Sequence, residues 1–72
     1  MPTVSALENI MRTGGSVIVD ATIPVVSLES VAKAGVGTGC TLTVKHANSL
    51  TATACESIAK CNPGHVIFDF TD

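Results

Sequence analysis

Few side chains in this 72-residue chain could carry out chemistry: three cysteines, two histidines, four basic and six acidic residues. A cysteine–histidine pair is the first arrangement to consider, because a histidine can activate a thiol as a nucleophile. Cys40 and His46 lie at opposite ends of a segment with strand-like composition. Six extended residues span about 20 Å. A catalytic pairing of His46 with Cys40 is therefore poorly supported.

The cysteines also raise the possibility of a metal site. Cys55, Cys61 and His65 form a C-x5-C-x3-H sequence, which differs from the usual ligand spacings of zinc. On a helix, six residues correspond to about 600° of rotation, so the two thiols would lie on different faces. We therefore expect no metal and no cofactor. The cysteines are expected to act as small, buried apolar residues. Their odd number, without an export signal, predicts free thiols and a cytoplasmic location.

Two aspartates offer paired carboxylates for acid–base chemistry. Across two strand spacings, Asp20 and Asp69 would lie about 9.6 Å apart, close to the separation in inverting glycoside hydrolases. Lys45 would lie between them and neutralise their charge rather than raise their proton affinity. The chain also lacks Trp and Tyr, so a sugar-binding cleft is not indicated. A small-molecule binder or minor enzyme using His46 and the Asp20–Lys45–Asp69 row stays open as an alternative.

An internal repeat predicts the helices that must position these residues. Three hexapeptides share an apolar or small residue, Glu, Asn or Ser, a β-branched residue, Met or Ala, and a base. They are residues 7–12 (LENIMR), 28–33 (LESVAK) and 55–60 (CESIAK). Their apolar residues recur at helical spacing. In each copy the acid precedes the base by four residues, which stabilises a helix by about 0.2–0.5 kcal/mol.

Local signals also indicate where two of these helices begin. Ser5 with Glu8 predicts a capping box at the start of the first helix. Thr53 with Glu56 predicts the same motif for the third helix, for which Ser49 is a competing start.

Each hexapeptide is followed by a glycine- or proline-containing breaker and then by a β-rich segment, within residues 16–21, 41–46 and 65–70. Strands separated by a helix run parallel, with right-handed crossovers. We therefore predict one α/β domain, a short right-handed solenoid with a three-stranded parallel sheet and helices on one face. Its three αβ units cover roughly residues 3–21, 27–47 and 49–71. The competing interpretation is a doubly wound sheet with strand order 2-1-3 and helices on both faces.

The alternation of residues along the strands favours the solenoid, because a sheet covered on both sides is apolar on both faces. One face of this sheet would be apolar: Val17, Val19, Ala21, Leu42, Val44, His46, Val66, Phe68 and Phe70. The other would be mixed and open: Ile18, Asp20, Thr43, Lys45, Ile67 and Asp69. His46 would then be a partly buried, hydrogen-bonded side chain at the end of the second strand.

Residues 42–50 (LTVKHANSL) resemble the strand-and-turn signature of leucine-rich repeats, L-x-L-x-x-N-x-L, with the Asn and the last Leu displaced by one position. Thr22, Ala47 and Thr71 occupy the positions at which that family has the Asn or Cys that ties adjacent turns together. The resemblance implies an α/β solenoid that acts as a recognition scaffold through its open strand face, rather than as an enzyme.

Charge and hydropathy exclude two classes of partner. The net charge of −2 provides no basic patch for nucleic acid. No apolar run approaches the ~20 residues of a membrane span.

Bare strand edges and two isoleucines on the open face predict self-association, most simply as a two-fold dimer, with an unidentified protein partner as an alternative. The expected interaction surface comprises Ile18, Asp20, Thr43, Lys45, Ile67, Asp69 and Phe70. A further alternative is a fragment of a longer solenoid, although Met1 at the start and a charged Asp72 at the end favour a complete chain.

Overall fold

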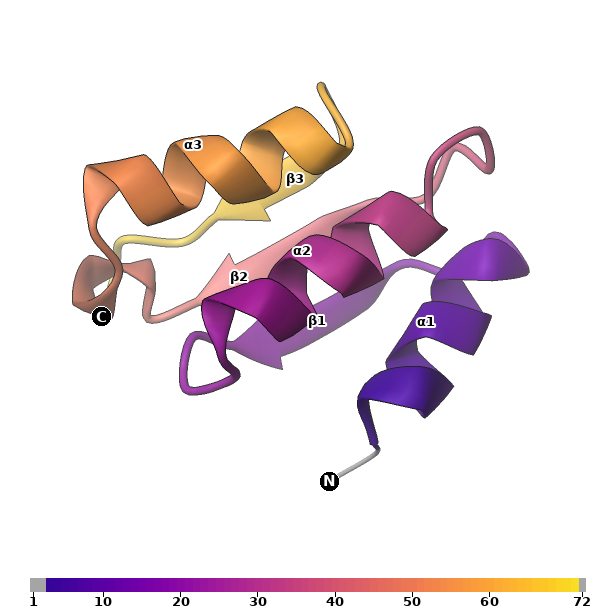
Figure 1. Cartoon of the computed structure of the whole chain (residues 1–72), viewed down its shortest axis with the longest axis horizontal. Coiled ribbons are helices and arrows are strands. Elements are labelled where there is room, and N and C mark those ends of the chain that lie inside the picture. The colour runs from indigo at the N-terminus through magenta and orange to yellow at the C-terminus, as the bar shows by residue number, and fades with distance from the viewer. Residues whose placement is uncertain (1–2, 72) are drawn as a thin grey trace.

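Helices and strands alternate along the chain (Figure 1), in a computed structural model that describes residues 3–71. In chain order the elements are α1 (Val4–Arg12), β1 (Val17–Asp20), α2 (Val25–Ala34), β2 (Leu42–Lys45), the 3-10 helix η1 (Ala47–Ser49), α3 (Ala52–Cys61) and β3 (Val66–Phe68). All three hexapeptides of the internal repeat fall within helices, and each β-rich segment contains a strand.

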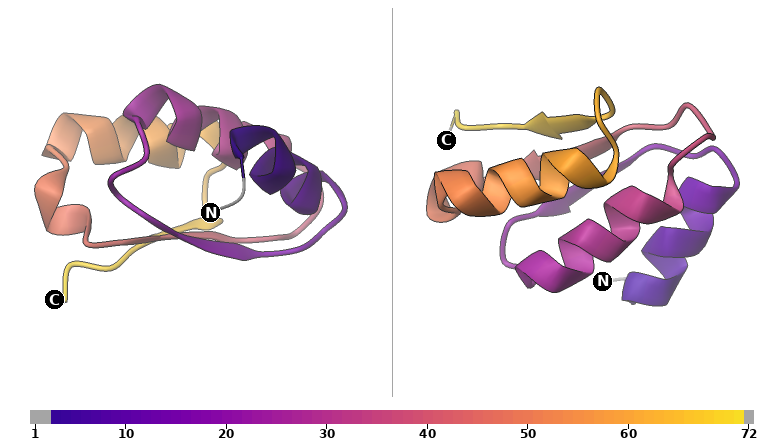
Figure 2. Two further views of the ribbon diagram at one scale, coloured as in Figure 1. Left: turned by 90° about the horizontal axis from the view of Figure 1, so that it is seen from below. Right: turned by 45° about the horizontal axis from the view of Figure 1, so that its top comes forward.

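The three strands form one parallel sheet in the order β1-β2-β3. Val44 in the middle strand pairs with Val19 on one side and with Phe68 on the other. The predicted parallel sheet with sequential strand order is therefore confirmed, and the competing order with β1 in the middle is wrong. All three helices cover the same face of the sheet (Figure 2), as the alternation of the strand residues predicts.

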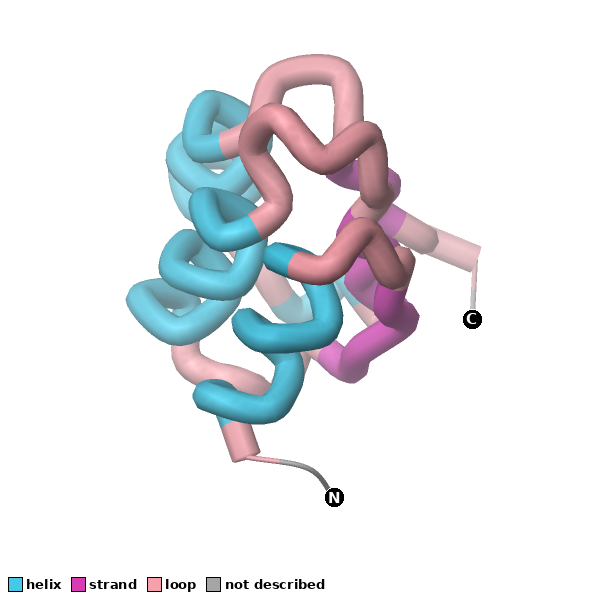
Figure 3. Tube along the Cα trace, turned by 90° about the vertical axis from the view of Figure 1, so that its right-hand side faces the viewer, coloured by secondary structure: helices cyan, strands magenta, loops and turns pink. Residues whose placement is uncertain are grey.

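The hydrophobic core lies between the layer of helices and the layer of strands (Figure 3). Its largest fully buried side chains are Met11, Leu28, Val31, Leu42, Val44 and Ile58. The middle helix, α2, packs against both α1 and α3, and its Leu28 is 0% exposed. Complete burial of such a side chain contributes about 1.5–3 kcal/mol, so α2 and β2 form the centre of the fold.

The helices begin earlier than the predicted capping boxes. Thr3 caps α1 and Thr51 caps α3, and each side chain accepts the backbone N–H three residues further on, at 3.2 and 3.1 Å respectively. Both lie two residues before the predicted caps, Ser5 and Thr53, which are inside the helices. The competing start, Ser49, belongs to η1. The predicted starts were wrong because a threonine stands two residues earlier in both segments, and that position lets the helix gain half a turn.

Of the three acid–base pairs in the repeat, the pair in α1 closes, with 3.6 Å between Glu8 Oε1 and Arg12 Nη2. Within residues 3–71, the corresponding pairs in α2 and α3 do not approach within 4.0 Å. The closed pair is partly exposed to solvent, where such contacts contribute little. Helix stability in this fold therefore rests on packing.

Candidate functional site

The sheet face without helices carries the predicted mixed row of side chains. Ile18 is 70% exposed and Ile67 is 54% exposed. The half-buried Thr43 lies between them, paired with Ile18 on one side and Ile67 on the other. These three residues therefore lie side by side as the sequence predicts.

The charged row is also in register, but its carboxylates bond elsewhere. Asp20 pairs with Lys45 along the sheet, and the amide of Asp69 bonds to β2, so the three residues are neighbours. The Asp20 carboxylate accepts the N–H of Thr22 at 3.0 Å. The Asp69 carboxylate accepts the N–H of Thr71 at 2.9 Å and also its hydroxyl. Each aspartate thus closes a turn at the end of its own strand instead of forming a tight pair with the lysine.

His46 occupies a different position from the one predicted. Its side chain is 53% exposed, and its Nδ1 lies 2.8 Å from Oδ2 of Asp20. The backbone of His46 has a φ of 59°, in the left-handed region. This conformation ends the alternation of β2 at Lys45 and turns the histidine out to solvent, while Ala47 takes the buried position. The expected hydrogen bond is present, but the expected place on the core face is wrong.

Both aspartates of the row are stabilised in their charged form. The N–H of Thr22, followed by the contact with His46, lowers the pKa of Asp20 below its ordinary value. The hydroxyl and amide of Thr71, and then the charge of Lys45, lower the pKa of Asp69. A catalytic acid needs the opposite shift, a raised pKa that keeps its proton at neutral pH. Neither aspartate of the row therefore has the raised pKa of a general acid.

The three cysteines are free. Cys40 is buried, and its Sγ lies 2.8 Å from the Thr38 hydroxyl and 3.3 Å from the backbone carbonyl of Met11. Cys55 and Cys61 are half-buried. Within the stretch that the structure describes, no three His, Cys, Asp or Glu side chains gather as a metal site would require. The small, buried role predicted for the cysteines is confirmed for Cys40.

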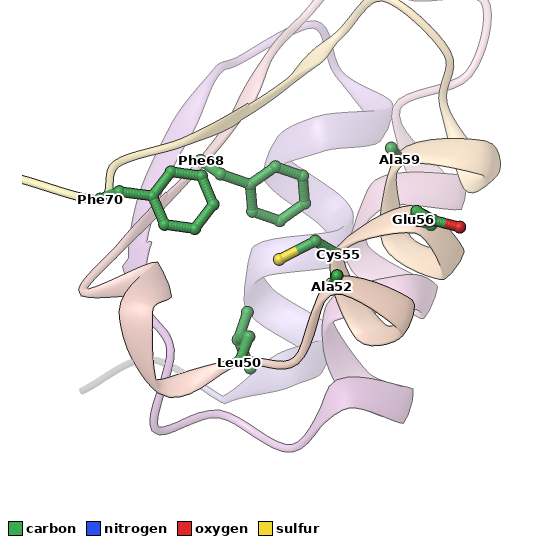
Figure 4. A pocket seen from close by; sticks show the side chains of 7 residues that line it. All are labelled: Leu50, Ala52, Cys55, Glu56, Ala59, Phe68 and Phe70. Atoms are coloured by element: carbon green, nitrogen blue, oxygen red, sulfur yellow. The ribbon is translucent and has the colours of Figure 1, made fainter.

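An open groove lies at the outer edge of the sheet, between α3 and β3. This groove has a volume of about 460 Å³ and is lined by Leu50, Ala52, Cys55, Glu56, Ala59, Phe68 and Phe70. The ring centroids of Phe68 and Phe70 lie 6.4 Å apart, and both rings lie along one side of the groove (Figure 4). Glu56 is the one charged residue of the lining, so the groove is an apolar surface.

The groove lies on the outer flank of α3 and β3, where residues 3–71 place no further helix or strand. Helix α2 is covered by α1 and α3, whereas α3 packs against a helix on one side alone. Likewise β3 pairs with β2 and is an edge strand. Phe68 is consequently half-buried, and Phe70 is 53% exposed although alternation along β3 predicts it on the core side. Phe68 and Phe70 therefore lie at or near the surface beside the edge strand and not inside the core.

Phe70 was expected in the interaction surface, whereas the other residues that line the groove were not. One signal for it is present in the sequence. Ala52, Cys55 and Ala59 recur at i, i+3 and i+7, the spacing of an apolar helical stripe. The fully buried Ile58 belongs to the core cluster, so the apolar surface of α3 extends from the core to the groove.

No family model, curated protein or solved structure matches this chain. Within residues 3–71, each helix is too short or too polar to cross a bilayer. Because a fold of this kind does not define an activity, the evidence for function is the geometry of the groove and of the strand edge beside it.

Proposed function

We propose that this chain is a self-associating protein module, a short αβ solenoid of the leucine-rich-repeat-like kind that works in the cytoplasm. In this proposal its outer flank, formed by α3 and β3, binds a second copy of the chain. The observation that carries the proposal is the apolar groove of about 460 Å³ beside the unpaired edge of β3. The free thiols support the reducing compartment.

The flank offers two kinds of interaction at once. The edge of β3 presents backbone N–H and C=O groups, which can accept another strand. Next to this edge, the rings of Phe68 and Phe70 present apolar surface. Removing such surface from water is worth about 25 cal/mol per Å². A partner strand would therefore gain hydrogen bonds and apolar contacts in the same place.

The small size of the core also favours association. A single core in a chain below about 70–80 residues rarely supplies more than about 3–5 kcal/mol. Among residues 3–71, six large apolar residues stay exposed, of which Ile67 lies on β3 and Phe70 just beyond it. Covering that end of the sheet would add stability that the isolated chain lacks. If the chain belongs to a longer solenoid, the next αβ unit would cover the same flank.

Sedimentation velocity from low micromolar to submillimolar concentration tests the proposal. We expect a concentration-dependent dimer. Phe70→Asp should weaken it by placing a charge in the groove. Val26→Asp is the matched control, because Val26 is 74% exposed and lies on α2 away from the groove lining. A folded monomer at every concentration would contradict the proposal, as would equal effects of the two substitutions.

One observation favours a second candidate, a small-molecule site at the carboxyl ends of β1 and β2. The hydrogen bond that His46 Nδ1 donates to Oδ2 of Asp20 fixes the imidazole ring, so that Nε2 could contact a ligand beside Lys45. NMR titration with acetate and inorganic phosphate would test this candidate. Saturable shifts confined to His46 and Lys45 would support it, and unchanged spectra would contradict it.

A further inference from the structure

The backbone of β3 specifies how a second strand can add to its edge. In a parallel ladder, alternate residues direct both backbone groups toward the same neighbour. The carbonyl of His65 accepts the N–H of Leu42 at 2.9 Å, and the N–H of Asp69 donates to the carbonyl of Val44 at 2.8 Å. Both contacts are to β2, so residues 65, 67 and 69 direct their backbone groups inward. Residues 66 and 68 therefore direct theirs to the free edge.

We propose that two copies of the chain pair their β3 strands antiparallel, about a two-fold axis that passes beside Ile67. This geometry rests on the proposed self-association and specifies its partner and register. Val66 of each copy would lie opposite the partner's Phe68 as a hydrogen-bonded pair. The two such pairs would form four interchain hydrogen bonds. The two Ile67 residues would face each other as the non-hydrogen-bonded pair at the axis, and the two sheets would join into one.

Side-chain complementarity selects this register. Side chains of residues 65, 67 and 69 share one face, because alternate residues of a strand point the same way. With Ile67 at the axis, His65 of each copy lies opposite the partner's Asp69, so two histidine–carboxylate pairs flank the isoleucine contact. An imidazole N–H can donate a hydrogen bond to a carboxylate across the strands. The pairing is self-complementary, as a two-fold interface must be.

The neighbouring registers lack this complementarity. The nearest shifts of the axis, to Val66 or to Phe68, also keep the outward backbone groups of β3 opposite one another. The first places His65 opposite the partner's Ile67, and the second places Ile67 opposite the partner's Asp69. Each shift therefore places an imidazole or a carboxylate opposite an isoleucine.

The helix-side face of β3 fits the same register. Phe70 of one copy, just beyond β3, would lie near the turn that contains the partner's Gly64. Open space surrounds that glycine, since no atom lies within 4 Å of a Cβ placed there. The grooves of the two copies would meet at the axis, because each runs along the outer edge of its own β3. Phe68 and Phe70 of both copies would then form one apolar cluster between the two α3 helices.

Disulfide trapping with a cysteine at the axis tests the geometry. Residues in a non-hydrogen-bonded antiparallel pair have Cα atoms about 4.5 Å apart, within the range that a disulfide can bridge. Ile67→Cys should form a 67–67 disulfide dimer under mild oxidation, in a background with Cys55→Ala and Cys61→Ala. Ile18→Cys is the matched control, since Ile18 is exposed on the same sheet face but lies on the opposite edge strand. Mass spectrometry identifies the linked residue.

Substitution of His65 tests the register independently. His65→Glu places like charges together at both flanking pairs, so we expect the dimer dissociation constant to rise about tenfold or more. His65→Lys keeps the attraction and should leave the constant near that of the unsubstituted chain.

Three outcomes are distinguishable. The register is supported if Ile67→Cys forms the 67–67 disulfide, Ile18→Cys links weakly, and His65→Glu but not His65→Lys raises the dimer dissociation constant. A chain that sediments as a dimer without forming the 67–67 disulfide overturns the register and leaves self-association standing. A chain that stays monomeric and links neither cysteine overturns both.

Discussion

The Nδ1 atom of His46 lies 2.8 Å from Oδ2 of Asp20, and this contact joins the ends of two neighbouring strands. The left-handed backbone of His46 makes the contact feasible, because it turns the side chain away from the core and toward the end of β1. The same carboxylate also accepts the N–H of Thr22. Asp20 therefore ties the turn after β1 to the turn after β2.

Acid should destabilise the fold through Asp20. Folding lowers the pKa of this carboxyl below its ordinary value of 3.8. Its contribution to the free energy of unfolding is thus present above the unfolded pKa and is lost as pH falls toward the folded pKa. Urea unfolding should show a loss of stability between about pH 5 and about pH 3, and Asp20→Asn should reduce the loss.

A matched control for this measurement is Glu56→Gln, which removes an exposed carboxylate from α3. It should keep the acid-dependent loss of the unsubstituted chain. Parallel pH profiles for the unsubstituted chain and Asp20→Asn would contradict the role of the strand-end hydrogen bonds.

The backbone at position 46 should prefer glycine to alanine. A left-handed conformation costs a residue with a Cβ about 1–2 kcal/mol, whereas glycine adopts it freely. His46→Gly and His46→Ala both remove the hydrogen bond to Asp20, so their difference isolates the backbone. We expect His46→Gly to be more stable by about 1 kcal/mol in urea unfolding. Equal stabilities, or a more stable alanine variant, would show that the left-handed turn is not formed in solution.

Packing of α2 should dominate the stability of the monomer. Leu28 is 0% exposed, and Leu28→Ala should cost about 2–5 kcal/mol. A loss of this size is close to the whole stability of so small a core, so the variant should be largely unfolded by circular dichroism. Val26→Ala on the same helix should change stability by less than about 0.5 kcal/mol, because Val26 is 74% exposed. Similar losses for the two variants would contradict the burial of α2.

Proline at adjacent positions of β3 should separate association from folding. Val66→Pro removes an N–H that faces the free edge, so the chain should fold and lose the dimer. Ile67→Pro removes an N–H that faces β2 and thus a hydrogen bond of the ladder, so its free energy of unfolding should be lower than that of Val66→Pro. Circular dichroism measures the fold and sedimentation measures the dimer. Retention of the dimer by a folded Val66→Pro variant would show that the edge is not the interface.

Much of this fold could be predicted from the sequence, because the repeat fixes the order of the elements. The helical spacing around Leu28 and the alternation around Val44 each indicate a type of element and its buried side. The strand register follows, since equal units place Asp20, Lys45 and Asp69 side by side.

The remaining differences come from local backbone geometry and from the ends of the fold. The alternation of β2, continued through residue 46, predicted that the His46 side chain lies on the core face. The left-handed backbone of His46 itself turns that side chain to the solvent instead. Two threonines, Thr3 and Thr51, compete with the predicted caps, and pattern alone does not rank them. The groove was missed because it depends on which unit lacks a neighbour. That is a property of the assembled fold and not of α3 or β3 alone.

Amide hydrogen exchange along β3, followed by NMR at rising protein concentration, tests whether the edge of this strand pairs with a second copy. We expect the amides of Val66 and Phe68 to exchange rapidly in dilute solution and to become protected as the dimer forms, while the amide of Ile67 is protected throughout. Rapid exchange at Val66 and Phe68 at the highest concentration would contradict pairing at this edge.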